Sequence, residues 1–410
     1  INALRCAIAY NSGDAQGSIS FARKALILLD PELWIVRVMV RMYLGGSLLM
    51  QGDAKGGYQA YYGAFEDEQI QNKRFKATLL MTACYFHWIT ADLQSMKQAA
   101  KQSIALCQES GHRQILGQSN YHLGCVHYQQ NNLAAAEENF AWVVERPYRN
   151  YGVPYTSSVC GLALIYQNQG KEHQANKVIE DAIAFFLESG NTTLLPTILA
   201  LQAEMALKQG RLSAASQWAE NFDPVPPLAP MPYFMAPHLT LVKVWLAQNT
   251  SDSQRKAAQL LNQLDEYLAS THNTRFLIDT LALQALLEHA NGDQTAAMAA
   301  LEHALRLAQP GSFIRVFVDL GSEMADLLSQ IKPDRNLSKF VEQILTAFPE
   351  EQIQNRQSAS RHLPEPLKNR EQPILELLDR RLTNNEIATQ LVISPTTVKG
   401  HTLKIYQKLD

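Results

Sequence analysis

Hydroxyl and amine side chains gather close to the C-terminus, directly after a strong helix-start signal. Ser394 is a favourable N-cap, and Pro395 suits the first helical position, where its missing N–H costs nothing. The free N–H groups of such a helix start suit a phosphate, and the hydroxyls of Thr396 and Thr397 lie at the same end. Lys399 lies on the same outward side and is long enough to reach O6 and N7 of guanine. These residue types and their spacing predict contacts with the phosphates and bases of DNA.

Two short helices must position these side chains. Thr383 and Glu386 form a T-x-x-E capping box, in which each residue satisfies a backbone N–H of the other. Apolar residues then recur at helical spacing in two stretches separated by Val392-Ile393: Ile387, Ala388 and Leu391 in the first, and Val398, Thr402, Ile405 and Leu409 in the second. A capped helix, a tight turn and a second helix with a polar N-terminal end are the parts of a helix-turn-helix.

The order of these residues resembles the LuxR-type DNA-binding domain. The pattern E-I-A-x-x-L-x-I-S-x-x-T-V-K-x-H runs from Glu386 to His401, and Arg370-Glu371 matches that family's R-E pair at the start of its first helix. The resemblance implies that Lys399 contacts bases. Lys404 comes further along the predicted helix, and we expect it mostly to contact the DNA backbone. The full predicted DNA-binding set is Ser394, Thr396, Thr397, Lys399, Gly400, Leu403 and Lys404.

Some positions depart from the LuxR-type pattern. Gly400 costs about 1 kcal/mol of helix propensity relative to alanine, although it permits close approach to DNA. Leu403 occupies an exposed place where polar residues are usual. The chain stops at Asp410, before the fourth helix that LuxR-type domains generally use to dimerise. We therefore expect that helix to be missing, which lowers the DNA affinity expected of this chain alone.

Outside this region the sequence does not predict catalysis or metal binding. His122 and His127 share one helix but have no carboxylate or thiolate at ligand spacing, so packing is the preferred interpretation. The five cysteines form no C-x-x-C pair, which favours small buried residues in a reducing compartment. Packing between repeats explains most aromatic residues between positions 58 and 155, with stacking on a sugar or another planar ligand as the alternative. We expect no enzyme activity and no cofactor in this chain.

Self-similarity dominates the longer, N-terminal part of the chain. Turn-forming pairs recur about every forty residues, at Gly13-Asp14, Gly52-Asp53, Ala91-Asp92, Asn131-Asn132, Gly170-Lys171, Gly210-Arg211, Thr250-Ser251 and Gly292-Asp293. This period is typical of stacked helix pairs, each of which exposes an apolar face that the next pair covers. Gly124, Ala136 and Phe140 fit positions where tetratricopeptide helices approach closely. The sequence predicts an all-α, tetratricopeptide-like α-solenoid of about eight helix pairs.

Composition divides the chain into three regions: residues 1–348 as the solenoid, residues 349–366 as a flexible linker, and residues 367–410 as the helix-turn-helix domain. Within the solenoid, prolines in residues 223–232 predict a surface loop between the sixth and seventh helix pairs. Residues 310–319 are predicted to form an irregular or short extended segment. Capping helices are expected around residues 324–331 and 337–348, because the last apolar face must be shielded from water.

The whole arrangement resembles the large MalT-like transcriptional activators. The solenoid period, the proline-bearing break, the F-I-R-V-F-V-D segment at residues 313–319 and the LuxR-type terminus carry this resemblance. In that family a nucleotide-binding ATPase precedes the solenoid, but G-x-x-x-x-G-K-[ST] does not occur here, since Gly170-Lys171 is followed by Glu172. Because a repeat is already under way at Ile1, we expect a fragment that lacks the ATPase.

Overall composition narrows the class of protein. The 410 residues carry a net charge of −3 and are 46% hydrophobic, so any nucleic-acid binding must be local. The most apolar run, residues 33–50, contains Arg37 and Arg41, which argues against a membrane span. We expect a cytoplasmic, sequence-specific regulator that binds promoter DNA as an activator, self-associates in the intact protein, and senses a small-molecule inducer or protein partner through its solenoid. The alternatives are a tetratricopeptide interaction scaffold and the sensor and effector arm of a larger signalling ATPase.

Overall fold

The computed structural model of the chain describes residues 1–63, 72–150, 152–190, 192–224, 234–332 and 335–349, and, nearer the C-terminus, residues 374, 377–378, 382–391, 393–395 and 397–402. The chain divides into two compact units, residues 1–347 and 348–410. This division lies beside the predicted end of the solenoid at residue 348. Apart from Pro349, the predicted linker lies outside the described residues, and it stays a prediction.

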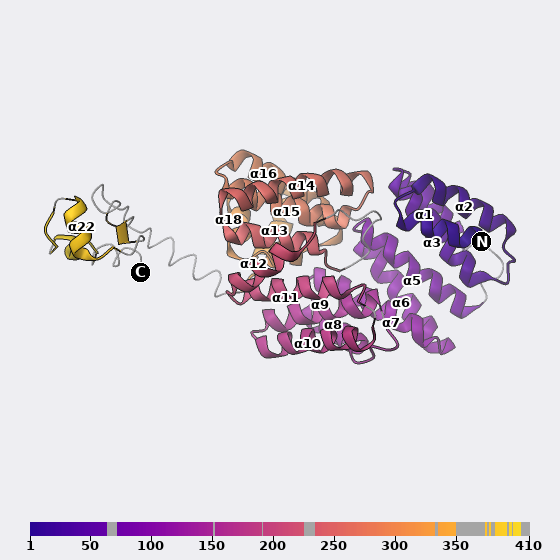
Figure 1. The fold of residues 1–410 in the computed structure, drawn as a ribbon. Coiled ribbons are helices and arrows are strands. Elements are labelled where there is room, and N and C mark those ends of the chain that lie inside the picture. Colours follow the sequence, from indigo (N-terminus) through magenta and orange to yellow (C-terminus); the bar gives the residue numbers. More distant parts are fainter. Residues whose placement is uncertain are drawn as a thin grey trace. The chain divides into compact units, whose positions relative to one another are not determined.

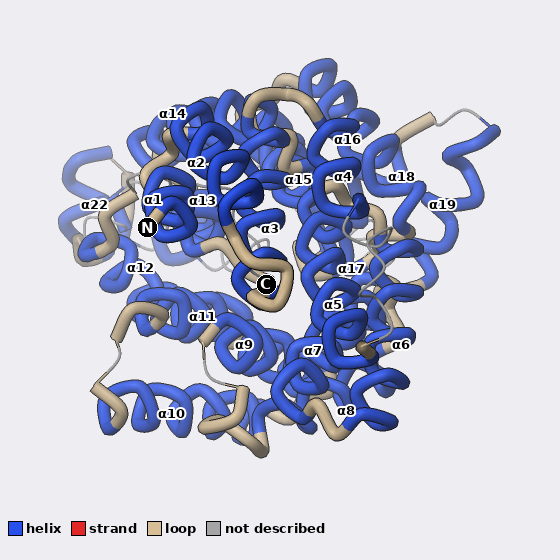
Figure 2. Tube along the Cα trace, turned by 90° about the vertical axis from the view of Figure 1, so that its right-hand side faces the viewer, coloured by secondary structure: helices blue, strands red, loops and turns tan. Residues whose placement is uncertain are grey.

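The described part of the first unit contains eight consecutive helix pairs (Figures 1 and 2). They are α1 (Asn2–Asn11) with α2 (Ala15–Leu28), α3 (Trp34–Met50) with α4 (Ala54–Tyr62), α5 (Lys73–Ile89) with α6 (Leu93–Ser110), α7 (Arg113–Gln129) with α8 (Leu133–Val144), α9 (Val153–Asn168) with α10 (Glu172–Glu188), α11 (Leu195–Lys208) with α12 (Leu212–Asn221), α13 (Pro237–Gln248) with α14 (Ser251–Ser270), and α15 (Thr274–Ala290) with α16 (Gln294–Ala308). No strand occurs among the described residues (Figure 2). The predicted all-α solenoid is confirmed.

A residue with left-handed backbone conformation joins the two helices of each of these pairs. It has a φ between 48° and 84°, and it is Gly13, Gly52, Ala91, Asn131, Gly170, Gly210, Asn249 or Gly292. In the second pair, the N–H of Asp53 donates to the carbonyl oxygen of Leu48 (2.9 Å), and the Asp53 side chain accepts from the N–H of Gly56 (2.7 Å) to cap α4. Glycine and asparagine tolerate the left-handed conformation, which explains why turn-forming residues recur with the repeat.

Successive pairs approach closely where the sequence places small residues. Gly124 on α7 and Gly161 on α9 face the two edges of the Phe140 ring, and a Cβ atom at these positions would lie 2.6 and 2.3 Å from ring carbons. Ala136 on α8 is fully buried. Interiors this tightly packed do not accept a larger side chain without strain. The small residues assigned to close helix contacts therefore make them.

The stacked pairs curve so that late helices return to early ones (Figure 1). Helix α15 packs against α5, and α17 (Arg315–Val318) packs against α7. Just before α17, the N–H of Ile314 donates to the carbonyl oxygen of Gln129 at 2.8 Å. The extended alternative for residues 310–319 is wrong, because η3 (Gln309–Gly311) is a 3₁₀ turn and α17 is one α-helical turn. No strand lies beside this segment in the described structure, and helical turns satisfy part of its backbone hydrogen bonding locally.

Helices α18 (Ser322–Gln330) and α19 (Arg335–Thr346) lie where the two capping helices are predicted. In the proline-bearing break between α12 and α13, residues 225–233 lie outside the described residues, so the predicted surface loop stays largely untested. Phe234, directly after it, is only 4% exposed. Its ring centroid lies 5.1 Å from that of Tyr128 and 5.7 Å from that of Phe140. The residue that directly follows the break thus packs in the core of the superhelix, which the sequence pattern did not indicate.

Candidate functional site: a helix-turn-helix and a buried polar network

In the second unit, α22 (Asn384–Leu391) begins with the predicted capping box. The N–H of Thr383 donates to Oε2 of Glu386 at 2.7 Å, and the N–H of Glu386 donates to Oγ1 of Thr383 at 3.4 Å. Hydrogen bonds from the Thr383 backbone and hydroxyl lower the pKa of Glu386 below its ordinary value. The carboxylate therefore stays charged at neutral pH, as the positive end of a helix dipole favours.

A small apolar core fixes α22 to the helical residues that follow it. Ile374, Ile387, Ala388 and Val398 are buried together. The N–H of Ile393 donates to the carbonyl oxygen of Ala388 at 3.0 Å, which turns the chain at the end of α22. Because the core takes residues from both sides of this turn, the surface of the second helix has a fixed orientation within the unit.

The second helical stretch starts at Ser394, as the sequence predicts. Its Oγ accepts a hydrogen bond from the N–H of Thr397 at 3.0 Å, and its carbonyl oxygen accepts one from the N–H of Val398 at 3.1 Å. The hydroxyls of Ser394 and Thr397 also lie 2.7 Å apart and share a hydrogen bond. The Ser394 hydroxyl therefore caps the helix. The hydroxyl oxygens of Ser394 and Thr397 can each still accept a further hydrogen bond.

The described residues of the predicted DNA-binding set face solvent. Ser394, Thr397, Lys399 and Gly400 are exposed. A Cβ atom at Gly400 would meet no atom within 4 Å, so the surface is open there. The remaining predicted contacts, and two predicted apolar positions, lie outside the described residues: Thr396, Leu403, Lys404, Ile405 and Leu409.

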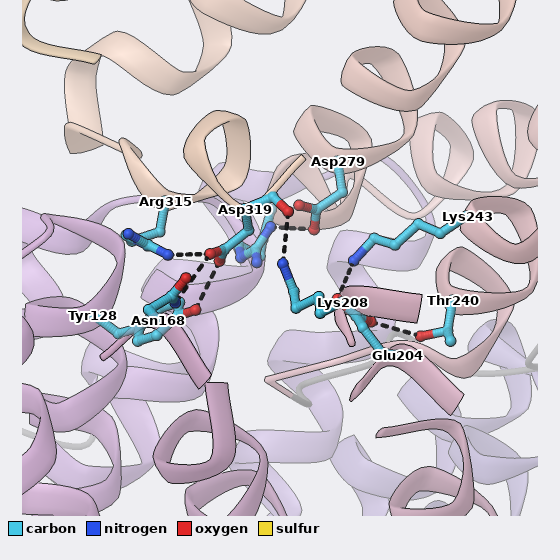
Figure 3. Close-up of polar contacts among 10 residues, drawn as sticks. Tyr128, Asn168, Glu204, Lys208, Thr240, Lys243, Asp279, Arg315 and Asp319 are labelled. Carbon is cyan, nitrogen blue, oxygen red and sulfur yellow. Dashed lines mark hydrogen bonds and ion pairs between the residues drawn. The ribbon is translucent and has the colours of Figure 1, made fainter. Parts of the chain in front are cut away.

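Inside the first unit, polar side chains converge on Asp319, which directly follows α17 (Figure 3). The Tyr128 hydroxyl donates to Oδ2 of Asp319 at 2.7 Å, and Nδ2 of Asn168 donates to Oδ1 at 3.5 Å. Nζ of Lys208 donates to the Asp319 carbonyl oxygen at 2.8 Å. Arg315, one turn earlier, forms an ion pair with the Asp319 carboxylate. Asp319 therefore ties α7, α9 and α11 to the segment around α17.

Two more ion pairs lie beside this network. Nζ of Lys243 on α13 lies 2.6 Å from Oε1 of Glu204 on α11. Oε2 of Glu204 also accepts a hydrogen bond from the Thr240 hydroxyl at 2.9 Å. On α15, Arg275 forms an ion pair with Asp279. Buried or half-buried charges of this kind are tolerated because each is paired and hydrogen-bonded.

Burial and pairing set the pKa values of the three carboxyl groups. Burial is the largest single influence on Asp319 and raises its pKa, but the charges of Arg315 and Lys208 and the hydrogen bonds to the carboxylate together outweigh it, so the pKa lies below its ordinary value. The pKa of Glu204 is lowered in the same way, since the charges of Lys243 and Lys208 and the hydrogen bonds to its carboxylate together outweigh the effect of burial. For Asp279, burial prevails and the pKa is raised.

A cavity of about 60 Å³ lies beside the network. Its charged lining residues are Glu204, Lys243, Arg275, Asp279 and Asp319. The remaining lining includes Tyr128, Phe234 and Leu283, so the cavity touches helices from the fourth to the eighth pair. Since one water needs roughly 10–15 Å³ of such volume, the cavity has room for only a few water-sized groups.

Sequence reasoning missed this network. The F-I-R-V-F-V-D segment was noted only for its family resemblance. The available signal was its two charged residues, Arg315 and Asp319, within an apolar run, because charges that become buried need partners. Lys208, Glu204 and Lys243 occupy ordinary solenoid helices and have no local signature.

Packing accounts for the other candidates that the sequence raised. Tyr61, Trp88 and Tyr121 are at most 1% exposed, so they fill the core. The His122 ring is also buried, with its centroid 4.5 Å from that of Tyr85. Among the described residues, no group of three His, Cys, Asp or Glu side chains is placed to hold a metal ion, and none of the helices is long and apolar enough to cross a membrane.

The two units define the class of the chain as a tetratricopeptide-like superhelix with a C-terminal helix-turn-helix domain. Residues 1–334 match the family of the MalT-like TPR region, and residues 365–410 match the bacterial regulatory proteins of the luxR family. The chain belongs to the MalT-like family, as its resemblance indicates. Both matched regions are regulatory rather than catalytic modules.

Comparison with individual proteins agrees with this assignment. The HTH-type transcriptional regulator MalT of Vibrio campbellii is 24% identical over 100% of this chain and 48% of the relative. MalT of Vibrio cholerae is 27% identical over 39% of this chain and 19% of the relative. The chain thus spans about half the length of the Vibrio campbellii relative. A solved structure of the Rap protein, complexed with Competence and Sporulation Factor, has the same fold, with a TM-score of 0.55 at 9% identity over 86% of this chain and 98% of that one.

Proposed function

We propose that this chain is the sensor and DNA-binding portion of a bacterial transcriptional activator of the MalT type. The observation that carries the proposal is the match to two consecutive regulator modules, the second of which presents Lys399 on an open helix surface. The N–H groups at the start of that helix suit a phosphate, and the lysine suits a guanine edge. Promoter DNA is therefore the partner of the second unit, and the bacterial cytoplasm is its compartment.

The superhelix has the sensing role in this proposal. The Rap structure supports that role, because a protein of the same fold is there complexed with Competence and Sporulation Factor. An inducer or protein partner on the superhelix would then control self-association of the intact protein. Self-association matters for DNA binding, because two linked helix-turn-helix domains read two half-sites one helical turn apart.

The experiment that tests this function is an enrichment of bound sequences from a pool of randomised duplexes. The chain is used with a leucine-zipper dimerisation segment fused after Asp410. A gel shift then compares the enriched duplex with a scrambled duplex between about 50 and 200 mM salt. We expect the enriched duplex to be retained at salt concentrations that release the scrambled one, because base contacts add to the phosphate contacts.

The interaction-scaffold alternative predicts a different result in the same gel. A scaffold would enrich no common sequence, and both duplexes would be released at the same salt concentration. The signalling-ATPase alternative concerns a longer protein, and sequencing upstream of the codon for Ile1 tests it through the presence of a phosphate-binding loop.

A further inference from the structure

Exposed apolar side chains gather at one end of the superhelix. Among the described residues, eleven large apolar side chains are exposed to solvent, and eight of them belong to residues 1–39. These eight form the α1 surface: Ile1, Leu4, Ile8, Ile27, Leu28, Leu33, Ile35 and Met39. Each is between 48% and 89% exposed. Single exposed apolar side chains are ordinary on a soluble protein, whereas a cluster of them marks an interaction site.

The members of the α1 surface lie together because three helices meet at this end (Figure 1). Those on α1 follow one another at helical spacing and form a stripe. Helices α1 and α2 run antiparallel, with Cζ of Arg5 5.8 Å from the centroid of the Phe21 ring, so the start of α1 lies beside the end of α2. Helix α3 starts at the same end, since Nη1 of Arg37 donates to the carbonyl oxygens of Leu26 and Leu29, both at 2.9 Å.

The late end of the superhelix has no comparable surface. Helix α19 packs against α16 and α18 there, and the described residues after Leu212 include no exposed large apolar side chain. Terminal units of a repeat array normally have a polar outer face, because no further unit packs on it. Helix α1 is apolar on both sides instead, with Cys6 and Ala9 buried on one side and the exposed stripe on the other. The α1 surface therefore has the composition of an interface.

The charges beside these apolar side chains indicate which partner fits. Arg5 is exposed on α1, and Asp30 and Glu32 are exposed on the connection between α2 and α3. Within the described chain, Arg5 contacts the Phe21 ring, Asp30 accepts from the N–H of Glu32 at 2.8 Å, and no ion pair joins Arg5 to either carboxylate. The surface thus carries charges of both signs that are not paired with each other. Such a surface is complementary to a second copy of itself.

We propose that a second copy of this chain covers the α1 surface, in a two-fold symmetric contact between the α1 ends of two superhelices. The proposal rests on the proposed function and names the surface responsible for its self-association. A two-fold contact joins the same patch of both copies, so the apolar stripes meet and Arg5 of each copy faces Glu32 of the other. Pairing also brings two helix-turn-helix domains into one particle, as two half-sites require.

Sedimentation velocity of the purified chain over a range of concentrations tests the proposal. We expect the mass of a dimer at high concentration and that of one chain after dilution. Leu4→Glu combined with Ile8→Glu should weaken the dimer by about a hundredfold or more, because carboxylates then lie in an apolar contact. Both positions are exposed, so the fold should persist, which circular dichroism checks. Leu187→Glu, at an exposed position of α10, is the control and should leave the dimer unchanged.

Two charge variants test the two-fold arrangement itself. Arg5→Glu and Glu32→Arg should each weaken the dimer, because like charges then face each other in both contacts. A mixture of the two variants should associate again, since each contact of the mixed pair joins a carboxylate to an arginine. This recovery requires two copies of the chain in the same contact, and a change in folding does not produce it.

The mass of one chain at every concentration overturns the proposal, and the α1 surface would then belong to a different protein or to another part of a longer protein. A dimer that Leu4→Glu with Ile8→Glu does not weaken overturns it as well, as does a mixture of charge variants that associates no better than either alone. The gel shift described above dimerises the chain through the zipper. A monomeric chain here therefore leaves the DNA-binding function standing, and absence of an enriched sequence there leaves the dimer standing.

Discussion

The hydroxyl of Tyr128 donates a 2.7 Å hydrogen bond to Asp319, which lies 191 residues later in the chain. Tyr128 lies near the C-terminal end of α7, in the fourth helix pair, and Asp319 follows the eighth pair. In an ordinary solenoid each repeat contacts only its neighbours. Here a contact across half of the array adds to the nearest-neighbour contacts. Together with the hydrogen bond from Ile314 to Gln129 and the packing of α15 on α5, it holds late helices against early ones.

Asp319→Asn should loosen this long-range tie. The change removes the charge that pairs with Arg315, which is 3% exposed, and breaking a buried pair costs about 3–5 kcal/mol. We expect faster amide hydrogen exchange at the ends of α7 and α9, where Tyr128 and Asn168 meet Asp319. Hydrogen exchange with peptide-level mass spectrometry measures the effect.

Asp279→Asn is the matched control for this variant. Asp279 is similarly half-buried and also pairs with an arginine one turn away, Arg275, but that pair lies within α15. Its loss should lower stability without a specific increase in exchange at α7 and α9. Equal exchange profiles in the two variants would mean that Asp319 contributes only local pairing.

A buried histidine makes the stability of the first unit depend on pH. Burial lowers the pKa of His122 to about 3, whereas an unfolded histidine titrates near 6.5. Between these values the unfolded chain binds a proton that the folded chain does not. The contribution of His122 is therefore fully present above about pH 6.5 and is lost as the pH falls toward 3, with a loss of about 2 kcal/mol at pH 5.

His122→Phe removes this titration while it keeps an aromatic ring among Tyr85 and Tyr121. Urea unfolding at pH 7 and at pH 5 should show a smaller stability difference for the variant than for the unaltered chain. His173→Phe, at an exposed position of α10, should keep the original difference. An unchanged difference in His122→Phe would assign the acid sensitivity to other groups.

Larger side chains at the close helix contacts should separate adjacent pairs. Gly124→Leu adds volume next to the Phe140 ring, and Ala136→Leu adds volume at a fully buried position of α8. Overpacking of this kind typically costs about 1–3 kcal/mol. Ala134→Leu, on the exposed side of the same α8, is the control and should have little effect. Thermal unfolding followed by circular dichroism gives the comparison. If all three variants melt together, these residues do not mark the close contacts between repeats.

The helix pairs could be predicted because their signal is local and repeated. A left-handed residue such as Gly52 and the cap that follows it lie within a few residues of each other, so the sequence contains the whole turn. The capping box at Thr383 and the cap at Ser394 are predictable for the same reason. The network around Asp319 is different, since Lys208 lies 111 residues from it and Tyr128 lies 191. These residues meet because the superhelix curves, and its curvature is the sum of small rotations between many successive helix pairs. The sequence of any one pair therefore does not indicate the contact.

Lys399 is the residue on which the DNA-binding proposal depends most. It is exposed on a helix whose start is fixed by Ser394 and whose inner side is fixed by buried Val398. Lys399→Ala should cost about 1–3 kcal/mol on the enriched duplex and relax its sequence preference, because a base contact is lost. Gel shifts of the zipper-dimerised chain on enriched and scrambled duplexes measure both effects.

Lys404→Ala is the companion variant, because Lys404 comes further along the predicted helix and is expected mostly to contact the DNA backbone. It should weaken binding to both duplexes by a similar factor and reduce the slope of log affinity against log salt by about one. The two lysines are thus distinguished by which duplex responds and by the salt slope, not by affinity alone. If Lys399→Ala retains the affinity and the sequence preference of the unaltered chain, this helix does not read DNA. Both lysines would then only solvate an exposed surface, and the interaction-scaffold alternative would replace the regulator proposed here.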